Sequence, residues 1–202
     1  MRGLKSKLIL TVTVLGCAAT VAGFATFSAF SSTTSNSGNS FEAGTVYISD
    51  NDSGSAMYSV TNKKPAESLS RCIKVTYTGT LDSTVKLYAS SVGAVGQYLT
   101  LLIETGTGSP TFGGPSAEGC TGFTADASPT LYNGTLKGFA DTYTNFSNGL
   151  ADNPGAATKW VTNDAVVYKF TLTLEDNNAA NGAGSGALST GAHSFTWEAQ
   201  NQ

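Results

Sequence analysis

Hydrophobic and polar residues alternate with a period of two along much of the chain beyond residue 44. The clearest run is 166–174, whose even-numbered positions are Val166, Tyr168, Phe170, Leu172 and Leu174. Such alternation predicts a strand with one face packed against a core and the other face in contact with solvent. Other runs rich in β-branched and aromatic residues also predict strands, at 45–48, 56–60, 72–77, 84–88, 98–103 and 194–199.

Residues that favour turns separate these runs and indicate how the strands are joined. Gly, Ser and Pro are frequent in 106–129 and Gly in 177–192; neither stretch has a hydrophobic period, so both are expected to be exposed loops. Only 136–150 has apolar residues at spacings of three and four, which predicts a short amphipathic helix over an open sheet edge. The fold class predicted is all-β, an antiparallel jelly roll or β-sandwich with a short helix and long Gly/Ser-rich loops.

The N-terminal region has the pattern of a secretion signal. Positive residues at positions 2, 5 and 7 precede an apolar run from Leu8 to Phe30, and the first acidic residue is Glu42. Small side chains near the end of the run place the cleavage between Ala29 and Phe30. The product is therefore expected to be secreted or extracellular, either free or associated with the cell surface.

Two alternatives for the N-terminal region stay open. The 23 residues from Leu8 to Phe30 are long enough to span a bilayer, so an uncleaved signal could serve as an anchor. The sequence Val14-Leu15-Gly16-Cys17 also resembles a lipoprotein box, in which the thiol would carry a lipid. The domain organisation favoured here is a signal peptide over 1–29, a flexible N-terminal segment over 30–43 and a β-sandwich domain over 44–202.

The charge balance argues against nucleic acid as a partner. Without the three positive residues of the signal, 8 basic and 14 acidic residues remain, a net charge of about −6. The basic residues are scattered and form no stripe that could neutralise phosphates. Membrane contact is expected only through an uncleaved signal.

Two cysteines remain after processing, Cys72 and Cys120. In an oxidising compartment an even pair is expected to form a disulfide. The bond would close a loop of roughly 49 residues, for which chain entropy gives about 4 kcal/mol of stabilisation. The alternative is two separate buried thiols, because spacing alone does not show that the sulfur atoms meet.

The sequence offers few residues for chemistry. Its single histidine, His193, lacks the neighbouring ligands of a zinc site, so no catalytic residue and no cofactor is nominated. Asp50 and Asp52, followed by Gly54, match the front half of a calcium loop, but Thr61 stands where the closing glutamate is needed. A plain turn is the favoured interpretation of this segment, and calcium is the alternative.

Four segments share a pattern with one known family. The most specific part is the pairing of 25–30 (ATFSAF) with 40–48 (SFEAGTVYI), and the stretches 65–77 and 195–199 add to it. In these segments the chain resembles the TasA/camelysin (CalY) family of secreted proteins with SipW-type signal peptides. The resemblance implies a jelly-roll domain, a signal cut by a dedicated signal peptidase, and a role in surface or biofilm-matrix fibres.

The resemblance also implies a mechanism of assembly. Fibre-forming members are similar to donor-strand systems, in which the N-terminal segment of one subunit completes a sheet of the next. Residues 30–43 would be that segment here, anchored by Phe30 and Phe41, and the partner would be a second copy in a head-to-tail homopolymer. The simpler alternative is a disordered leader.

The function predicted is that of a secreted structural protein, a fibre subunit assembled by donor-strand exchange, and not of an enzyme. The alternative is a monomeric cell-surface adhesin or carbohydrate-binding module. A camelysin-like metalloprotease is less favoured, because zinc needs about three protein ligands and one histidine with two bonded cysteines leaves only carboxylates.

Overall fold

A computed structural model describes residues 40–115, 119–155, 157–176, 178–180 and 188–201. The chain divides into two units, Met1–Glu42 and Ala43–Gln202, and every helix and strand described below lies in the second. The hydrophobic core also belongs to that unit. Residues from Ala43 onward therefore have a core of their own.

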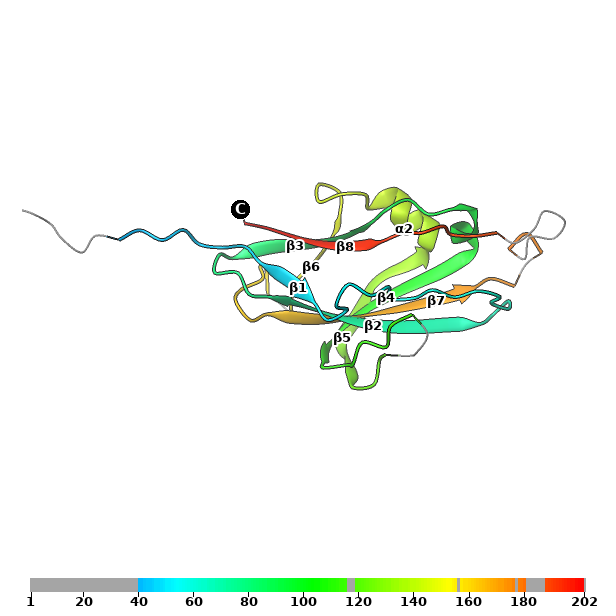
Figure 1. Ribbon diagram of the computed structural model, residues 1–202, viewed down its shortest axis with the longest axis horizontal. Coiled ribbons are helices and arrows are strands. Elements are labelled where there is room, and N and C mark those ends of the chain that lie inside the picture. Colours follow the sequence, from blue (N-terminus) through cyan, green and yellow to red (C-terminus); the bar gives the residue numbers. More distant parts are fainter. Residues whose placement is uncertain (1–39, 116–118, 156, 177, 181–187, 202) are drawn as a thin grey trace, which may run out of the picture. The chain divides into compact units, whose positions relative to one another are not determined.

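The second unit consists of two antiparallel sheets that pack face to face (Figure 1). The five-stranded sheet has the order β1-β2-β7-β4-β5. Its strands are β1 (Ile48–Asp50), β2 (Ser68–Tyr77), β7 (Ala165–Leu174), β4 (Leu99–Gly108) and β5 (Phe123–Thr135). The three-stranded sheet has the order β6-β3-β8, with β6 (Leu150–Asp152), β3 (Ser83–Ala89) and β8 (Phe195–Asn201). The all-β, antiparallel sandwich is confirmed, and the jelly-roll topology stays a prediction.

The core confirms the alternation that the sequence showed in β7. Val166, Tyr168, Phe170, Leu172 and Leu174 are each at most 8% exposed and face the three-stranded sheet. Aromatic pairs join the two layers, with ring centroids 4.7 Å apart for Phe170 and Phe195 of β8 and 5.2 Å apart for Tyr168 and Trp197 of β8. The strand β8 is therefore attached to the core through its side chains.

The outer face of the large sheet is less exposed to solvent than the alternation in the sequence predicted. Val167 lies on that face and is only 1% exposed. Gly106 is its register partner in β4, and a Cβ there would collide with the ring of Phe123 and the carbonyl oxygen of Thr124. The close approach of β5 at a glycine thus helps to cover the outer face.

Two short helices lie between strands: the 3-10 helix η1 (Ala94–Tyr98) and α2 (Leu136–Thr142). The Thr135 hydroxyl caps α2 by accepting from the backbone N–H of Gly138 at 3.0 Å. The prediction of a helix through residue 150 is wrong beyond Thr142. There the Asn148 side chain accepts from the backbone N–H groups of Thr144 and Asn145, both at 3.0 Å, and holds a turn.

The sequence analysis predicted one strand that is absent and missed two strands that are present. Residues 56–60 form no strand, because their backbone has no partner strand among the described residues. The expected loop 106–129 contains the end of β4 and the first half of β5, and the short strand β6 was not predicted. The strand β5 escaped notice because it is an irregular edge strand, with register shifts near Glu104, where Pro129 is tolerated.

No helix in the described ranges combines the length and the apolar character needed to cross a membrane.

Candidate functional site

The two sheets leave one side of the sandwich open, between β1 and β8. The strand β8 is an edge strand that pairs only with β3, and β1 is the edge of the other sheet and pairs only with the end of β2. A groove of about 200 Å³ lies between them, lined by β1, Val75 and residues 195–197. We call this groove, with the free edge of β8, the seam.

The backbone of β8 is what makes the seam a candidate site. In an antiparallel pair, alternate residues turn their N–H and C=O groups toward the partner and the others turn them away. Among the described residues, no strand bonds to the side of β8 that faces away from β3. Unpaired edge groups of this kind can accept an additional strand.

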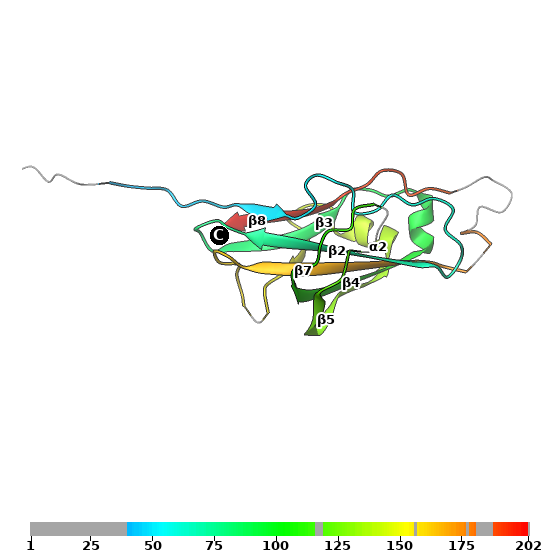
Figure 2. The same cartoon turned by 60° about the horizontal axis from the view of Figure 1, so that its bottom comes forward.

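The segment 51–67 follows β1 and leads back to the start of β2, as the cyan trace in Figure 2 shows. Met57 and Tyr58 are the side chains of this segment that pack against the core. The Tyr58 hydroxyl lies 2.5 Å from Nε2 of His193, which stands just before β8. The segment thus contacts the N-terminal end of β8 beside the seam.

His193 is fixed from both sides of its ring. Its Nδ1 lies 3.1 Å from the carbonyl oxygen of Gly191, which can only accept, so Nδ1 carries the hydrogen and Nε2 accepts from Tyr58. Burial raises the pKa of the Tyr58 hydroxyl, which therefore stays protonated and able to donate. The sequence gave no sign of this pair.

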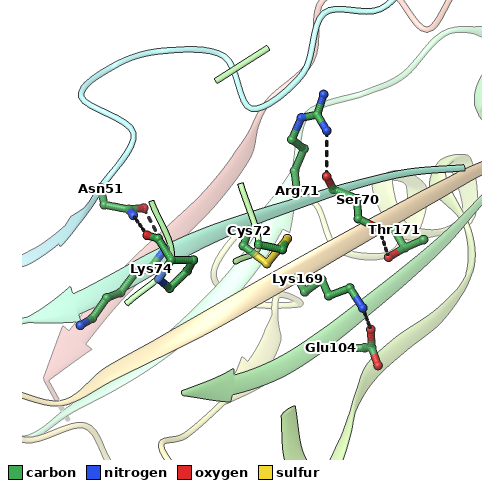
Figure 3. Close-up of a disulfide and its surroundings, with 10 residues drawn as sticks. Asn51, Ser70, Arg71, Cys72, Lys74, Glu104, Lys169 and Thr171 are labelled. Carbon is green, nitrogen blue, oxygen red and sulfur yellow. Dashed lines mark hydrogen bonds and ion pairs between the residues drawn. A yellow bond between two sulfur atoms is a disulfide. The ribbon is translucent and has the colours of Figure 1, made fainter. Parts of the chain in front are cut away.

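The cysteines meet as expected. A disulfide joins Cys72 of β2 to Cys120, with Cα atoms 5.0 Å apart, so the alternative of two separate thiols is wrong (Figure 3). Beside it on the outer face, Lys169 forms an ion pair with Glu104 at 3.0 Å and its ammonium group lies 5.7 Å from the centroid of the Phe123 ring. The bond fixes the connection between β4 and β5 to the sheet and lies away from the core.

Asp50 and Asp52 hold a turn. The backbone N–H of Asp52 donates to Oδ1 of Asp50 at 3.0 Å, and that of Gly54 donates to Oδ1 of Asp52 at 2.6 Å. Burial raises the pKa of Asp50, the amide of Asp52 opposes this rise, and the Asp52 carboxylate adds to it. These contacts support the interpretation as a plain turn, and calcium binding at Asp50 and Asp52 has no further support.

The structure describes only some of the residues predicted to form the donor strand. Phe41 is 96% exposed, which is unusual for a large aromatic side chain. Ala29 and Phe30, the predicted cleavage residues, lie outside the described residues, so the cleavage site and the Phe30 anchor stay predictions.

A polar pocket that was not predicted from the sequence lies at β4, β5 and β6, away from the seam. It is a pocket of about 410 Å³ lined by Thr105, Asp126, Ser128, Asp152 and their neighbours. Burial raises the pKa of Asp152, the Tyr168 hydroxyl opposes this rise, and the Asp126 carboxylate adds to it. The Asp152 carboxylate is thus held in a setting that disfavours its charge.

The residues present do not fit a zinc centre. Both ring nitrogens of His193 are engaged, and Cys72 and Cys120 are bonded to each other. In the described part of the chain, no three His, Cys, Asp or Glu side chains gather closely enough to hold a metal ion. Structural and catalytic zinc both need at least three protein ligands.

A comparison with protein-family models finds a match to the family described as camelysin metallo-endopeptidase, over residues 3–94. The matched part includes the predicted signal, β1, β2 and β3. No curated protein matches the chain.

Proposed function

Since the match over residues 3–94 confirms the resemblance to the TasA/camelysin family, we propose that this chain is a secreted structural protein, a subunit of surface or biofilm-matrix fibres. The unpaired edge of β8 beside β1 is the observation that carries the proposal. A rigid sandwich with an open edge is suited to binding another chain by strand addition.

The proposed occupant of the seam is residues 30–43 of a second copy. These 14 residues can span roughly 46 Å when extended, about twice the length of the seven-residue strand β8. Their Ser, Thr, Asn and Gly residues cannot form a core alone, so pairing with a neighbour would supply their backbone hydrogen bonds.

Phe30 and Phe41 would anchor the donor segment in different ways. They are 11 positions apart, and in a regular strand an odd separation places two side chains on opposite faces. One ring would therefore enter the groove against residues 195–197, while the other would pack on the outer surface. Phe41, being 96% exposed, has a side chain ready for such a contact.

The geometry of the contact determines the kind of assembly. The donor segment and the seam are different surfaces. Each copy would therefore insert its own donor segment into the seam of one neighbour and bind the donor segment of another neighbour in its own seam. A head-to-tail contact of this type gives rings only if the rotation closes, and otherwise gives filaments. Fibres follow without any additional interface.

The test compares two forms of the protein by electron microscopy at high concentration. The form that begins at Phe30 is expected to make filaments, and the form that begins at Gly44 is expected to remain monomeric, because it keeps the seam but lacks the donor segment. If both remain monomers, the donor-strand mechanism is wrong for this chain. Filaments from the form that begins at Gly44 would also contradict it.

The family description favours a second candidate, a metallo-endopeptidase. The chemistry of the donor set does not fit zinc, for the reasons given above, so no step through a metal is derived.

A further inference from the structure

The segment 51–67, which joins β1 to β2, is held on the sandwich mainly by side chains. Within the described chain, residues 52–65 make no backbone-to-backbone hydrogen bond to either sheet. Most of their side chains are exposed, and Val60 is 43% exposed. The segment lies along the open side of the sandwich (Figures 1 and 2), and the backbone of its residues 52–65 does not pair with either sheet.

The ends of the segment are fixed, and its middle is held by side chains. The Asn51 side chain accepts from the Lys74 backbone N–H at 2.9 Å, and the Ala66 backbone N–H donates to the carbonyl oxygen of Leu174 at 2.8 Å. Between these points, the contacts with the core come from Met57 and Tyr58. Among the described residues, the bond from Tyr58 to His193 is the one hydrogen bond that joins residues 53–63 to a part of the chain outside the segment 51–67.

That single bond is placed next to the edge that the proposed donor strand would use. His193 precedes β8 by two positions, and its ring lies 6.0 Å from that of Phe195, a residue that lines the groove. The Tyr58 ring lies 5.5 Å from His193. A strand that extended along β8 toward residue 193 would have to displace Tyr58.

We infer that residues 51–67 form a lid over the seam and that the hydrogen bond between Tyr58 and His193 is its latch. The inference rests on the proposed donor-strand function, because it assigns a regulator to that same seam. The lid covers the end of the β8 edge next to His193 in a free subunit, and an incoming donor segment that reaches this end replaces the lid. The backbone of residues 52–65 makes no hydrogen bond to either sheet in the described chain, so this part of the lid can lift without breaking the sandwich.

The latch makes a quantitative prediction. A net side-chain hydrogen bond of ordinary strength shifts an opening equilibrium by roughly three- to tenfold. The variant Y58F removes the hydroxyl and keeps the ring in the core, so the lid should open more often by that factor. The matched control is Y88F, because the Tyr88 hydroxyl also donates to a residue of β8, Glu198 at 2.9 Å, but on the outer face of the small sheet.

The experiment uses the chain that begins at Gly44, which retains the whole core, and a labelled synthetic peptide with the sequence of residues 30–43. Association is followed by fluorescence anisotropy, and hydrogen exchange of residues 51–67 is measured without peptide. The expected result is faster association and faster exchange for Y58F, by roughly three- to tenfold, with Y88F equal to the unmodified chain.

A second variant tests the latch from the other side. H193L should act as Y58F does, and the double variant should show no further increase, because both substitutions remove the same bond. Additive effects of the two substitutions would contradict the latch.

The outcomes separate the lid from the donor strand. If the peptide binds all variants at the same rate and lid exchange is unchanged in Y58F, the lid is wrong and the proposed donor strand stands. If lid exchange rises but the peptide binds the seam of none of them, the donor-strand function is contradicted and the regulation inferred from it is overturned too.

Discussion

Cys72 and Cys120 are bonded on the outer face of the large sheet although 48 positions separate them along the chain. The bond anchors the connection between β4 and β5 to β2, a strand that is not adjacent to either of them in the sheet. Arg71, next to Cys72, adds a hydrogen bond from its guanidinium to the carbonyl oxygen of Pro115 at 3.3 Å. The outer connection is therefore held at two neighbouring points of β2.

Removal of this bond should lower stability without changing the fold. The double variant C72A/C120A is expected to lose up to about 4 kcal/mol of unfolding free energy, because the unfolded chain gains the freedom of the loop. Urea unfolding followed by tryptophan fluorescence measures the loss. Unmodified protein in reductant should unfold at the same urea concentration as the variant, and an unchanged midpoint in both would contradict a stabilising role.

The two faces of β7 should respond differently to truncation. Phe170 is fully buried, and F170A is expected to cost about 3–5 kcal/mol of unfolding free energy through lost contacts and a cavity. The matched control is T171A on the opposite face, which loses a hydrogen bond to the Ser70 hydroxyl at 3.0 Å and should cost about 1 kcal/mol. Similar losses for both variants in urea unfolding would contradict the assignment of faces.

Asp152 should make stability depend on pH. Burial raises the pKa of this carboxyl in the folded state, so the folded protein holds the proton more tightly than the unfolded chain. Its contribution to stability is therefore present at low pH and is lost as pH rises from the unfolded value of about 3.9 through the raised folded value.

The variant D152N isolates this effect. The unfolding free energy of the unmodified protein relative to D152N should fall as pH rises above about 4. The exposed residue Asp82 provides the control, and D82N should follow the unmodified protein across the same range. A difference between the unmodified protein and D152N that does not change with pH would show that burial does not disfavour the charge.

The peptidase candidate can be decided by assay of highly purified protein that begins at Phe30. Because the described residues offer no fitting set of zinc ligands, hydrolysis of a protein substrate is expected to decline to background as purification proceeds, and added zinc should not restore it. Activity that survives purification, disappears with a chelator and returns with zinc would establish the enzyme instead.

Periodicity was a reliable guide where a strand lies in the middle of a sheet. The residues of β7 alternate because one face meets the core, and the structure places its even-numbered side chains there. The helix was found at its correct start, Leu136, but its end depends on the Asn148 side chain, which closes a turn across several residues. Such a contact leaves no hydrophobic pattern in the sequence.

Edge positions were the least predictable part of the fold. Residues 56–60 have the composition of a strand but lack a neighbour, since the segment crosses the open side of the sandwich. The reverse holds for β5, which contains Pro129 and Gly134 and is nevertheless paired with β4. Whether a segment forms a strand depends on which strand lies next to it in the fold, and composition does not contain that information. The residues of the candidate seam come from both ends of the domain, so composition could not show that they lie together.

The irregular register of β5 has a consequence for growth beyond the single subunit. This strand forms the opposite edge of the large sheet, and its pairing with β4 shifts between Ile103 and Glu104 and again before Gly106. A bulged edge is a poor template for further strands, so the fibres proposed above should not pair sideways into wider sheets. Thin threads of constant width are the expected product.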